Sequence, residues 1–319
     1  MKFRTEVDIK ESGRKIQIED KIFSIGSCFA SEISDLLRLG QLQTANNPFG
    51  TVFNPFSIAN AVKRLHDAGF YTGEELIAFN DEFISLDHHS SFDTRYMHQT
   101  LAKINSEIEK GNTFLQNSRW VIITYGTSYI YEFIPKQKLV ANCHKIPQKF
   151  FTKRLLTHQE ITDSLYNTVL HLNDICREDV QILFTVSPVR HTKDGMAENQ
   201  LSKSKLITAI HDVIPQFGNC HYLPVYELMM DDLRDYRFYK EDLIHPNNQA
   251  VSYIFEKFGN AYFSGQAKEF ITENFKINKA LEHKSSDEKD PKYILFREKL
   301  QQRIESQRKK ARHKIFPDD

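Results

Sequence analysis

The sequence of 319 residues lacks an excess of charge of either sign and lacks any long apolar run. Lysine and arginine together number 42, as do aspartate and glutamate, so the overall charge does not favour a nucleic acid or an anionic membrane surface. No segment approaches the roughly 20 apolar residues that cross a bilayer. We therefore expect no nucleic-acid partner and no membrane span.

Cysteine is also scarce. The four cysteines, Cys28, Cys143, Cys176 and Cys220, form no C-x-x-C pair, which favours free thiols in a reducing compartment. The N-terminal segment is polar and charged, without the apolar core of a secretory signal. Together these features predict a cytoplasmic protein.

Short apolar runs alternate with amphipathic helical patterns along most of the chain. The runs lie at residues 21–25, 120–125, 180–186 and 221–225. Continuous apolar runs are typical of strands buried on both faces, as in parallel sheets. Helical spacing follows at residues 29–37, 57–68, 161–172, 206–217 and 251–258. This order predicts an α/β fold in which helices cover both faces of a parallel sheet.

Two segments interrupt this alternation. Residues 70–115 form a long insertion that holds the polar cluster DHHSSFD. Residues 129–151 have the pattern of a hairpin with its turn near Lys136–Lys138, followed by a loop. Insertions of this kind often shape a binding site.

The chain changes character near residue 267, where charged, helix-prone sequence begins. We predict a domain over residues 1–266 and a charged helical tail over residues 267–319. Such a tail could pack against a protein partner.

Ser27 is the candidate nucleophile. It lies between a buried strand that ends at Gly26 and an amphipathic helix, at the sheet edge where open α/β proteins bind ligands. Free N–H groups at a helix start can stabilise an oxyanion. Two alternatives are an ordinary helix cap and a reactive thiol at Cys28.

Asp242 and His245 are the candidate acid–base pair. They are three residues apart in D-L-I-H-P-N, just before the last helix of the alternating pattern. An aspartate so placed can accept a hydrogen bond from one imidazole nitrogen and leave the other free to take a serine proton. In a sheet with strand order 2-1-3-4-5, this loop and Ser27 lie near the same edge.

These motifs resemble the GSCFA family over roughly residues 20–260. The matching segments are I-G-S-C-F-A at 25–30, N-N-P-F-G-T-V-F-N-P at 46–55, T-Y-G-T-S-Y at 124–129, N-C-H-K-I-P at 142–147 and S-P-V-R at 187–190. The family is in turn similar to the SGNH (GDSL-like) hydrolases. That resemblance implies a three-layer α/β/α sandwich with a flavodoxin-like parallel sheet, and ester chemistry through Ser27, Asp242 and His245.

The resemblance also implies an oxyanion hole formed by the backbone N–H groups of Ser27 and Gly50. SGNH enzymes add an asparagine in G-x-N, whereas this chain has Gly126-Thr127-Ser128. The hydroxyl groups of Thr127 and Ser128 are therefore the expected substitutes, with Asn54 and Asn142 as alternatives. Loss of one donor typically lowers the rate about 10²–10³-fold.

Other polar residues are predicted to bind substrate. His88, His89 and Asp93 lie in the long insertion, and their spacing fits no metal motif. Arg190 follows a buried strand and could clamp a carboxylate or phosphate, or form a surface salt bridge. Lys203 is expected in the first turn of a helix, where a cation opposes the helix dipole, and both a structural role and a specific contact with a ligand stay open for it. We expect no metal and no cofactor.

Three functions remain open from the sequence. The first is a hydrolase or acyltransferase that acts on a small-molecule or carbohydrate ester. The second is a binding module that keeps the fold and has little turnover, because the usual oxyanion asparagine is missing. The third is an enzyme that depends on Cys28.

Overall fold

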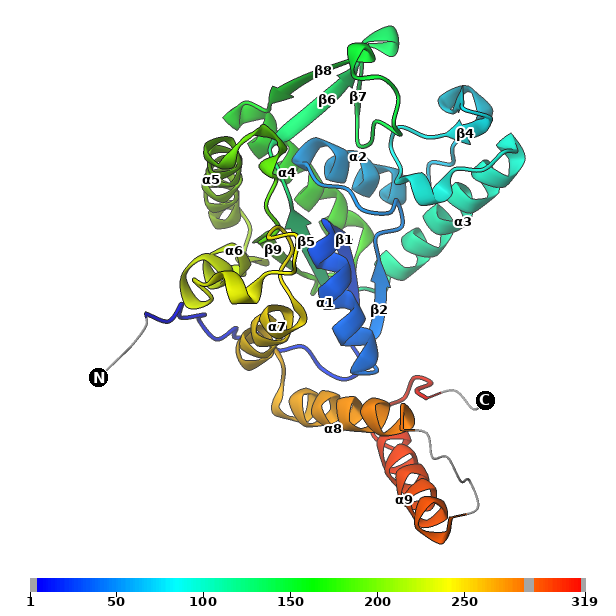
Figure 1. The fold of residues 1–319 in the computed structure, drawn as a ribbon, viewed down its shortest axis with the longest axis vertical. Coiled ribbons are helices and arrows are strands. Elements are labelled where there is room, and N and C mark those ends of the chain that lie inside the picture. The colour runs from blue at the N-terminus through cyan, green and yellow to red at the C-terminus, as the bar shows by residue number, and fades with distance from the viewer. Residues whose placement is uncertain (1–4, 284–289, 317–319) are drawn as a thin grey trace.

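A five-stranded parallel sheet forms the centre of the molecule (Figure 1). The computed structural model describes residues 5–283 and 290–316. The sheet strands are β1 Lys21–Gly26, β2 Gln43–Asn46, β5 Trp120–Tyr125, β9 Gln181–Val186 and β10 Cys220–Tyr222. Their order is β10-β9-β5-β1-β2, and each neighbouring pair is parallel. This is the flavodoxin-like order 2-1-3-4-5.

Helices cover both faces of this sheet. One face carries α1 Cys28–Leu39, α7 Asn248–Tyr262 and α8 Gly265–Leu281, and the other carries α2 Pro55–His66, α3 Met97–Leu115, α4 His158–Ile175 and α5 Met196–Val213. Successive strand residues alternate between the two cores, since Ile22 packs with the first group and Phe23 with the second. The predicted three-layer α/β/α sandwich is confirmed.

The predicted insertion divides into two parts. Its first part holds the small antiparallel pair β3 Ile77–Phe79 and β4 Glu82–Ile84. Its second part is α3, which buries Ile104 and Ile108 against the sheet. The last part of the predicted insertion is therefore a helix of the sandwich.

The predicted hairpin is present and belongs to a larger unit. Strand β6 Tyr129–Phe133 pairs antiparallel with β7 Lys138–Val140 and, on its other side, with β8 Phe151–Leu155. Gln137 has φ of 46° at the turn. The third strand, which begins where the predicted loop ends and was not expected, completes a three-stranded sheet above the helices (Figure 1).

The C-terminal helices pack on the domain. Helix α8 buries Phe270 and Ile271 in the same apolar cluster as α1, and the Asn274 amide donates to the Gly40 carbonyl oxygen at 2.9 Å. Helix α9 Pro291–Arg308 packs on α8 through an ion pair of Arg303 with Glu273 at 2.6 Å. The charged segment assigned to a tail thus includes nearly all of a helix that shares the core. Among the helices of the described ranges, none has the length and apolar character that a bilayer crossing requires.

Candidate active site

A tight turn between β1 and α1 positions Ser27. Gly26 has φ of 139°, and a Cβ atom at this position would overlap the backbone of Thr124 in the neighbouring strand β5. The Gly26 N–H donates to Asn47 Oδ1 at 2.7 Å, which fixes the end of the strand. Ser27 therefore lies at the carboxyl edge of the sheet, where the sequence analysis expected it.

The Ser27 side chain is buried and unpartnered. Ser27 is 1% exposed, and its Oγ has no hydrogen-bond partner within the described part of the chain. Ser27 occupies the N-cap position of α1, but its side chain makes no capping hydrogen bond. A buried hydroxyl without a partner is costly. The helix-cap alternative thus does not account for this serine.

Asp242 and His245 form a pre-arranged pair. Asp242 Oδ2 lies 2.7 Å from His245 Nδ1, and Oδ1 accepts hydrogen bonds from the backbone N–H groups of His245 and Ile244 at 2.9 Å each. These backbone donors, together with the imidazole, lower the Asp242 pKa to about 2. The carboxylate therefore holds Nδ1 and leaves Nε2 to face another group.

A contact with α1 holds the loop that carries this pair. The Lys240 ammonium pairs with Glu32 of α1 at 2.9 Å, five residues after Ser27. In Figure 1 the yellow loop before α7 passes beside the start of α1. Both candidate loops therefore lie at the same edge of the sheet.

Arg190 supports the same loop from the end of β9. Its guanidinium lies 4.0 Å from the centre of the Tyr239 ring, and Nη1 donates to the Leu243 carbonyl oxygen at 3.4 Å. Its backbone N–H donates to the Ile244 carbonyl oxygen at 3.3 Å. The contacts of Arg190 are with the loop of the acid–base pair.

Lys203 is fully buried beneath this edge. Its Nζ donates to the carbonyl oxygens of Gly126 at 2.6 Å and Ser187 at 2.7 Å. These two residues directly follow β5 and β9. Burial lowers the Lys203 pKa to about 7. Lys203 lies in the middle of α5, so its expected place in a first helical turn was wrong, and its contacts with backbone carbonyl oxygens fit the structural alternative.

The predicted oxyanion donors are engaged elsewhere. The Ser27 N–H donates to the Thr124 carbonyl oxygen at 3.0 Å, and the Gly50 N–H donates to the Asn47 carbonyl oxygen at 2.7 Å. The hydroxyl groups of Thr127 and Ser128 both bond to Ser202 of α5, at 3.0 Å and 3.1 Å. In this conformation the four predicted donors do not converge on a common point.

The two alternative asparagines also have structural partners. Asn54 Oδ1 accepts from the Ser57 N–H at 2.8 Å and so caps α2. Asn142 Oδ1 accepts from the His144 N–H at 3.1 Å. Both carbonyl oxygens thus stabilise local backbone.

The histidines of the insertion occupy different environments. His88 is fully buried, stacks on Phe49 with ring centres 4.5 Å apart, and bonds through Nδ1 to Ser85 Oγ at 2.8 Å. Burial lowers the His88 pKa to about 3, so the ring is a neutral core residue. His89 lies over the loop after β2, because a Cβ atom on Gly50 would overlap the His89 Cβ.

Asp93 joins the insertion to the loop before β8. Its Oδ2 lies 2.8 Å from His144 Nδ1, and His144 Nε2 lies 2.8 Å from the Ser85 carbonyl oxygen. The contact between Asp93 and His144 thus joins the insertion to the loop before β8. Within residues 5–283 and 290–316, no three His, Cys, Asp or Glu side chains gather as a metal site.

Cys28 lies next to Ser27 and is half-buried. Burial is the main cause that raises the Cys28 pKa, and the nearby Glu32 carboxylate adds to it. A reactive cysteine requires the thiolate. This environment therefore disfavours the Cys28-dependent alternative.

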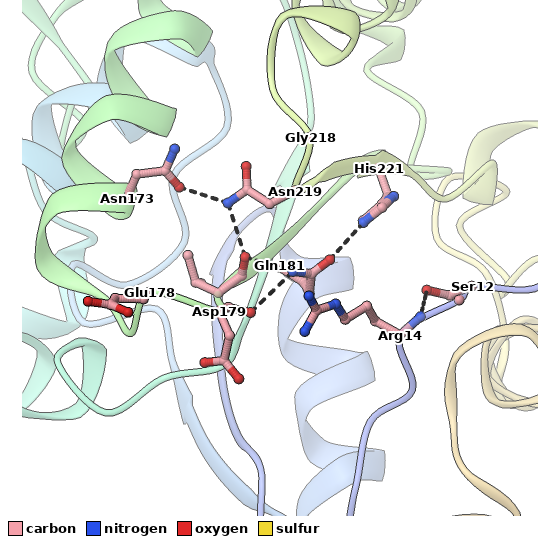
Figure 2. Close-up of a pocket in the computed structure, with 11 residues that line it drawn as sticks. Ser12, Arg14, Asn173, Glu178, Asp179, Gln181, Gly218, Asn219 and His221 are labelled. Carbon is pink, nitrogen blue, oxygen red and sulfur yellow. Dashed lines mark hydrogen bonds between the residues drawn. The ribbon is translucent and has the colours of Figure 1, made fainter.

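A polar groove of about 530 Å³ lies at the opposite, amino-terminal edge of the sheet (Figure 2). Two pairs of its polar side chains are hydrogen-bonded to each other, Asn173 with Asn219 at 2.8 Å and Gln181 with His221 at 3.0 Å (Figure 2). This groove contains none of the candidate catalytic residues.

The class defined by these features is an α/β/α sandwich with a buried serine after the first strand and an Asp–His pair at the same edge. The GSCFA family profile matches residues 21–258, and the chain belongs to this family. No curated protein matches the chain at a significant level.

The chain is similar to several solved structures, among them the following three. A carbohydrate esterase family 2 enzyme with a carbohydrate binding domain, from Corynascus thermopiles (Myceliophthora fergusii), is 12% identical with TM-score 0.38, covering 83% of this chain and 68% of that one. A carbohydrate esterase family 3 protein from Talaromyces cellulolyticus is 8% identical with TM-score 0.39, covering 79% and 98%. A DUF4886 family protein from Bacteroides uniformis is 10% identical with TM-score 0.38, covering 84% and 97%.

Proposed function

We propose that this chain is a serine hydrolase that cleaves or transfers the acyl group of an ester, with Ser27 as the nucleophile. The observation that supports this most is the pre-arranged Asp242–His245 pair, whose loop is tied to α1 by the Lys240–Glu32 ion pair. Small-molecule esters, including acetyl esters of carbohydrates, are the proposed substrates by resemblance to the SGNH hydrolases. We also propose a cytoplasmic location, since all four cysteines are free thiols.

In the proposed reaction, Ser27 Oγ attacks the acyl carbon while Nε2 of His245 takes the hydroxyl proton. Asp242 keeps the proton on Nδ1 and stabilises the imidazolium that forms. The imidazolium then gives its proton to the leaving alkoxide as the ester bond breaks. Water, activated by the same ring, releases the acid from Ser27, or a second alcohol takes the acyl group.

The reaction requires Ser27 Oγ to become accessible, because the hydroxyl is buried in this conformation. We propose that the side chain rotates about χ1 toward the bound ester. The Ser27 hydroxyl has no hydrogen-bond partner within the described residues, so this rotation breaks no hydrogen bond.

A ligand-binding module with little turnover is the second candidate. The observation that favours it is that the N–H groups of Ser27 and Gly50 are both hydrogen-bonded to backbone carbonyl oxygens. Without free donors, a site can still bind an ester and yet stabilise a tetrahedral intermediate poorly.

A fluorophosphonate probe distinguishes the two candidates. We expect wild-type protein to be labelled, and Ser27→Ala and His245→Ala to lose labelling, because the probe needs an activated serine. Cys28→Ser is the matched control and retains labelling. A folded wild-type protein that is neither labelled nor active on p-nitrophenyl acetate would establish the binding module instead.

A further inference from the structure

His191 carries a buried nitrogen that no part of the proposed mechanism uses. It follows Arg190 after β9, and its Nε2 is buried without a hydrogen-bond partner within the described residues. Its backbone is fixed, because the His191 N–H donates to Asn199 Oδ1 at 2.9 Å. A native structure rarely keeps such a nitrogen unpaired unless a ligand or water completes it.

The ring of His191 faces the carboxyl end of β5. Its Nε2 lies 3.2 Å from the position of a Cβ atom on Gly126, so the missing side chain of this glycine makes room for the imidazole. The ring also packs edge-on against Phe53, with centres 5.8 Å apart.

A continuous path of backbone contacts links this position to the nucleophile. The Phe53 carbonyl oxygen accepts from the Gly126 N–H at 2.7 Å, and the neighbouring Val52 N–H donates to the Gly26 carbonyl oxygen at 3.1 Å. Gly26 directly precedes Ser27. His191 therefore lies across the end of β5 from the turn that carries the serine.

The electrostatic surroundings keep this ring neutral. Burial lowers the His191 pKa to about 4, and the positive charges of Lys203, Lys153 and His245 act in the same direction, against Asp194. A neutral imidazole with its proton on Nε2 is a hydrogen-bond donor that does not carry a charge into the site.

We propose that the Nε2–H of His191 donates a hydrogen bond to the oxyanion of the tetrahedral intermediate. This inference rests on the proposed hydrolase function. It supplies a hydrogen-bond donor in place of the predicted oxyanion donors, which are bonded to other groups of the protein. When Ser27 Oγ bonds to the acyl carbon, the carbonyl π pair moves to oxygen and the hydroxyl proton goes to His245. His191 keeps its own proton throughout, and the oxyanion pair re-forms the carbonyl as the alkoxide leaves.

Three variants of the full-length chain test this role with p-nitrophenyl acetate as substrate. His191→Phe keeps the ring packing and removes the donor, and we expect kcat to fall about 10²-fold while KM stays within about threefold. His191→Gln restores a neutral donor and should recover a substantial part of kcat. His221→Gln, at the opposite edge of the sheet, is the matched control and should leave kcat unchanged.

Fluorophosphonate labelling separates failure of this inference from failure of the proposed function. If Ser27 of the wild type is labelled but His191→Phe keeps its kcat, or His191→Gln is no more active than His191→Phe, the role of His191 is overturned and the hydrolase stands. If the folded wild type is neither labelled nor active, both fail.

Discussion

Among the single residues, Asp242 bonds to Nδ1 of His245 and so, in the proposed reaction, determines that Nε2 faces the substrate. Asp242→Asn replaces the acceptor at Nδ1, and the ring can then turn or change tautomer. We expect kcat for an ester to fall about 10²–10⁴-fold with little change in KM. Steady-state kinetics measure this. Asp235→Asn, a cap in the same loop, is the control, and equal losses in both variants would contradict a specific role for Asp242.

Lys203 gives a second prediction, on stability. Lys203→Met removes the donor to two buried carbonyl oxygens, those of Gly126 and Ser187. We expect a loss of about 2–4 kcal/mol in the free energy of unfolding at pH 9, measured by urea denaturation. A neutral amine still has two N–H groups for these two acceptors.

The stability difference between wild type and Lys203→Met should also depend on pH. The folded pKa of Lys203 is about 7, below the unfolded value near 10.5. Between these values the unfolded chain binds a proton that the folded chain does not, so raising the pH favours folding. From pH 7 to 9, the free energy of unfolding of the wild type should rise relative to that of the variant, by at most about 1.4 kcal/mol per pH unit. A stability difference that does not change with pH would contradict a buried Lys203 amine that becomes neutral in this range.

The sequence predicts the position of a single residue well only where nearby residues in the chain determine it. Ser27 follows a glycine at a strand end, and Asp242 lies three residues before His245, so local patterns suffice. The partners of Lys203 and His191 come from distant strands, and no spacing reveals them. The only sequence signal for Lys203 was that a cation is unfavourable in the first helical turn, where it was expected.

Between elements, Arg190 links the end of β9 to the loop of the acid–base pair. Because it stacks on Tyr239 and bonds to Leu243, we expect Arg190→Ala to misplace His245 and lower kcat about 10–100-fold, with KM and Tm nearly unchanged. Arg177→Ala, in an exposed ion pair with Asp179, is the control. A rise in KM at constant kcat would instead establish the substrate clamp that the sequence suggested.

The C-terminal helices give a prediction on folding. A chain that ends at Ser264 loses α8, whose Phe270, Ile271 and Ile277 are buried. Each contributes about 1.5–3 kcal/mol, a large part of the 5–15 kcal/mol typical of a domain. We expect this chain to lose its cooperative melt in circular dichroism. A chain that ends at Leu281 keeps α8 and should still melt cooperatively, at lower temperature. Equal melts for both would contradict the role of α8.

The sequence predicts the elements more reliably than their partners. The strands from Trp120 and from Gln181 are mostly apolar and buried at every residue, and such runs favour a parallel sheet covered on both faces. Helix α8 has a buried stripe at Ala267, Phe270 and Ile271, but its many charged residues hid this stripe. Strand β8 has exposed charged residues and is defined only by its pairing with β6.

In the whole molecule, the parallel sheet brings three loops from distant parts of the sequence to one edge. The loop after β1 carries Ser27, the loop after β9 carries His191, and the loop before α7 carries Asp242 and His245. The strand order places β1 next to β5, with β9 on the other side of β5, so this convergence follows from topology. The rotamer of the serine depends on side-chain packing, and the engagement of the Ser27 and Gly50 N–H groups depends on the local backbone geometry. The sequence pattern encodes neither.

The measurement that tests the central claim most directly is mass spectrometry of the acyl-enzyme. Wild-type protein and His245→Ala are mixed with p-nitrophenyl acetate, stopped in acid and digested. The account predicts an acetyl group on Ser27 in the wild type and none in the variant. An acetyl group on Cys28, or equal acetylation of Ser27 in both proteins, would contradict it.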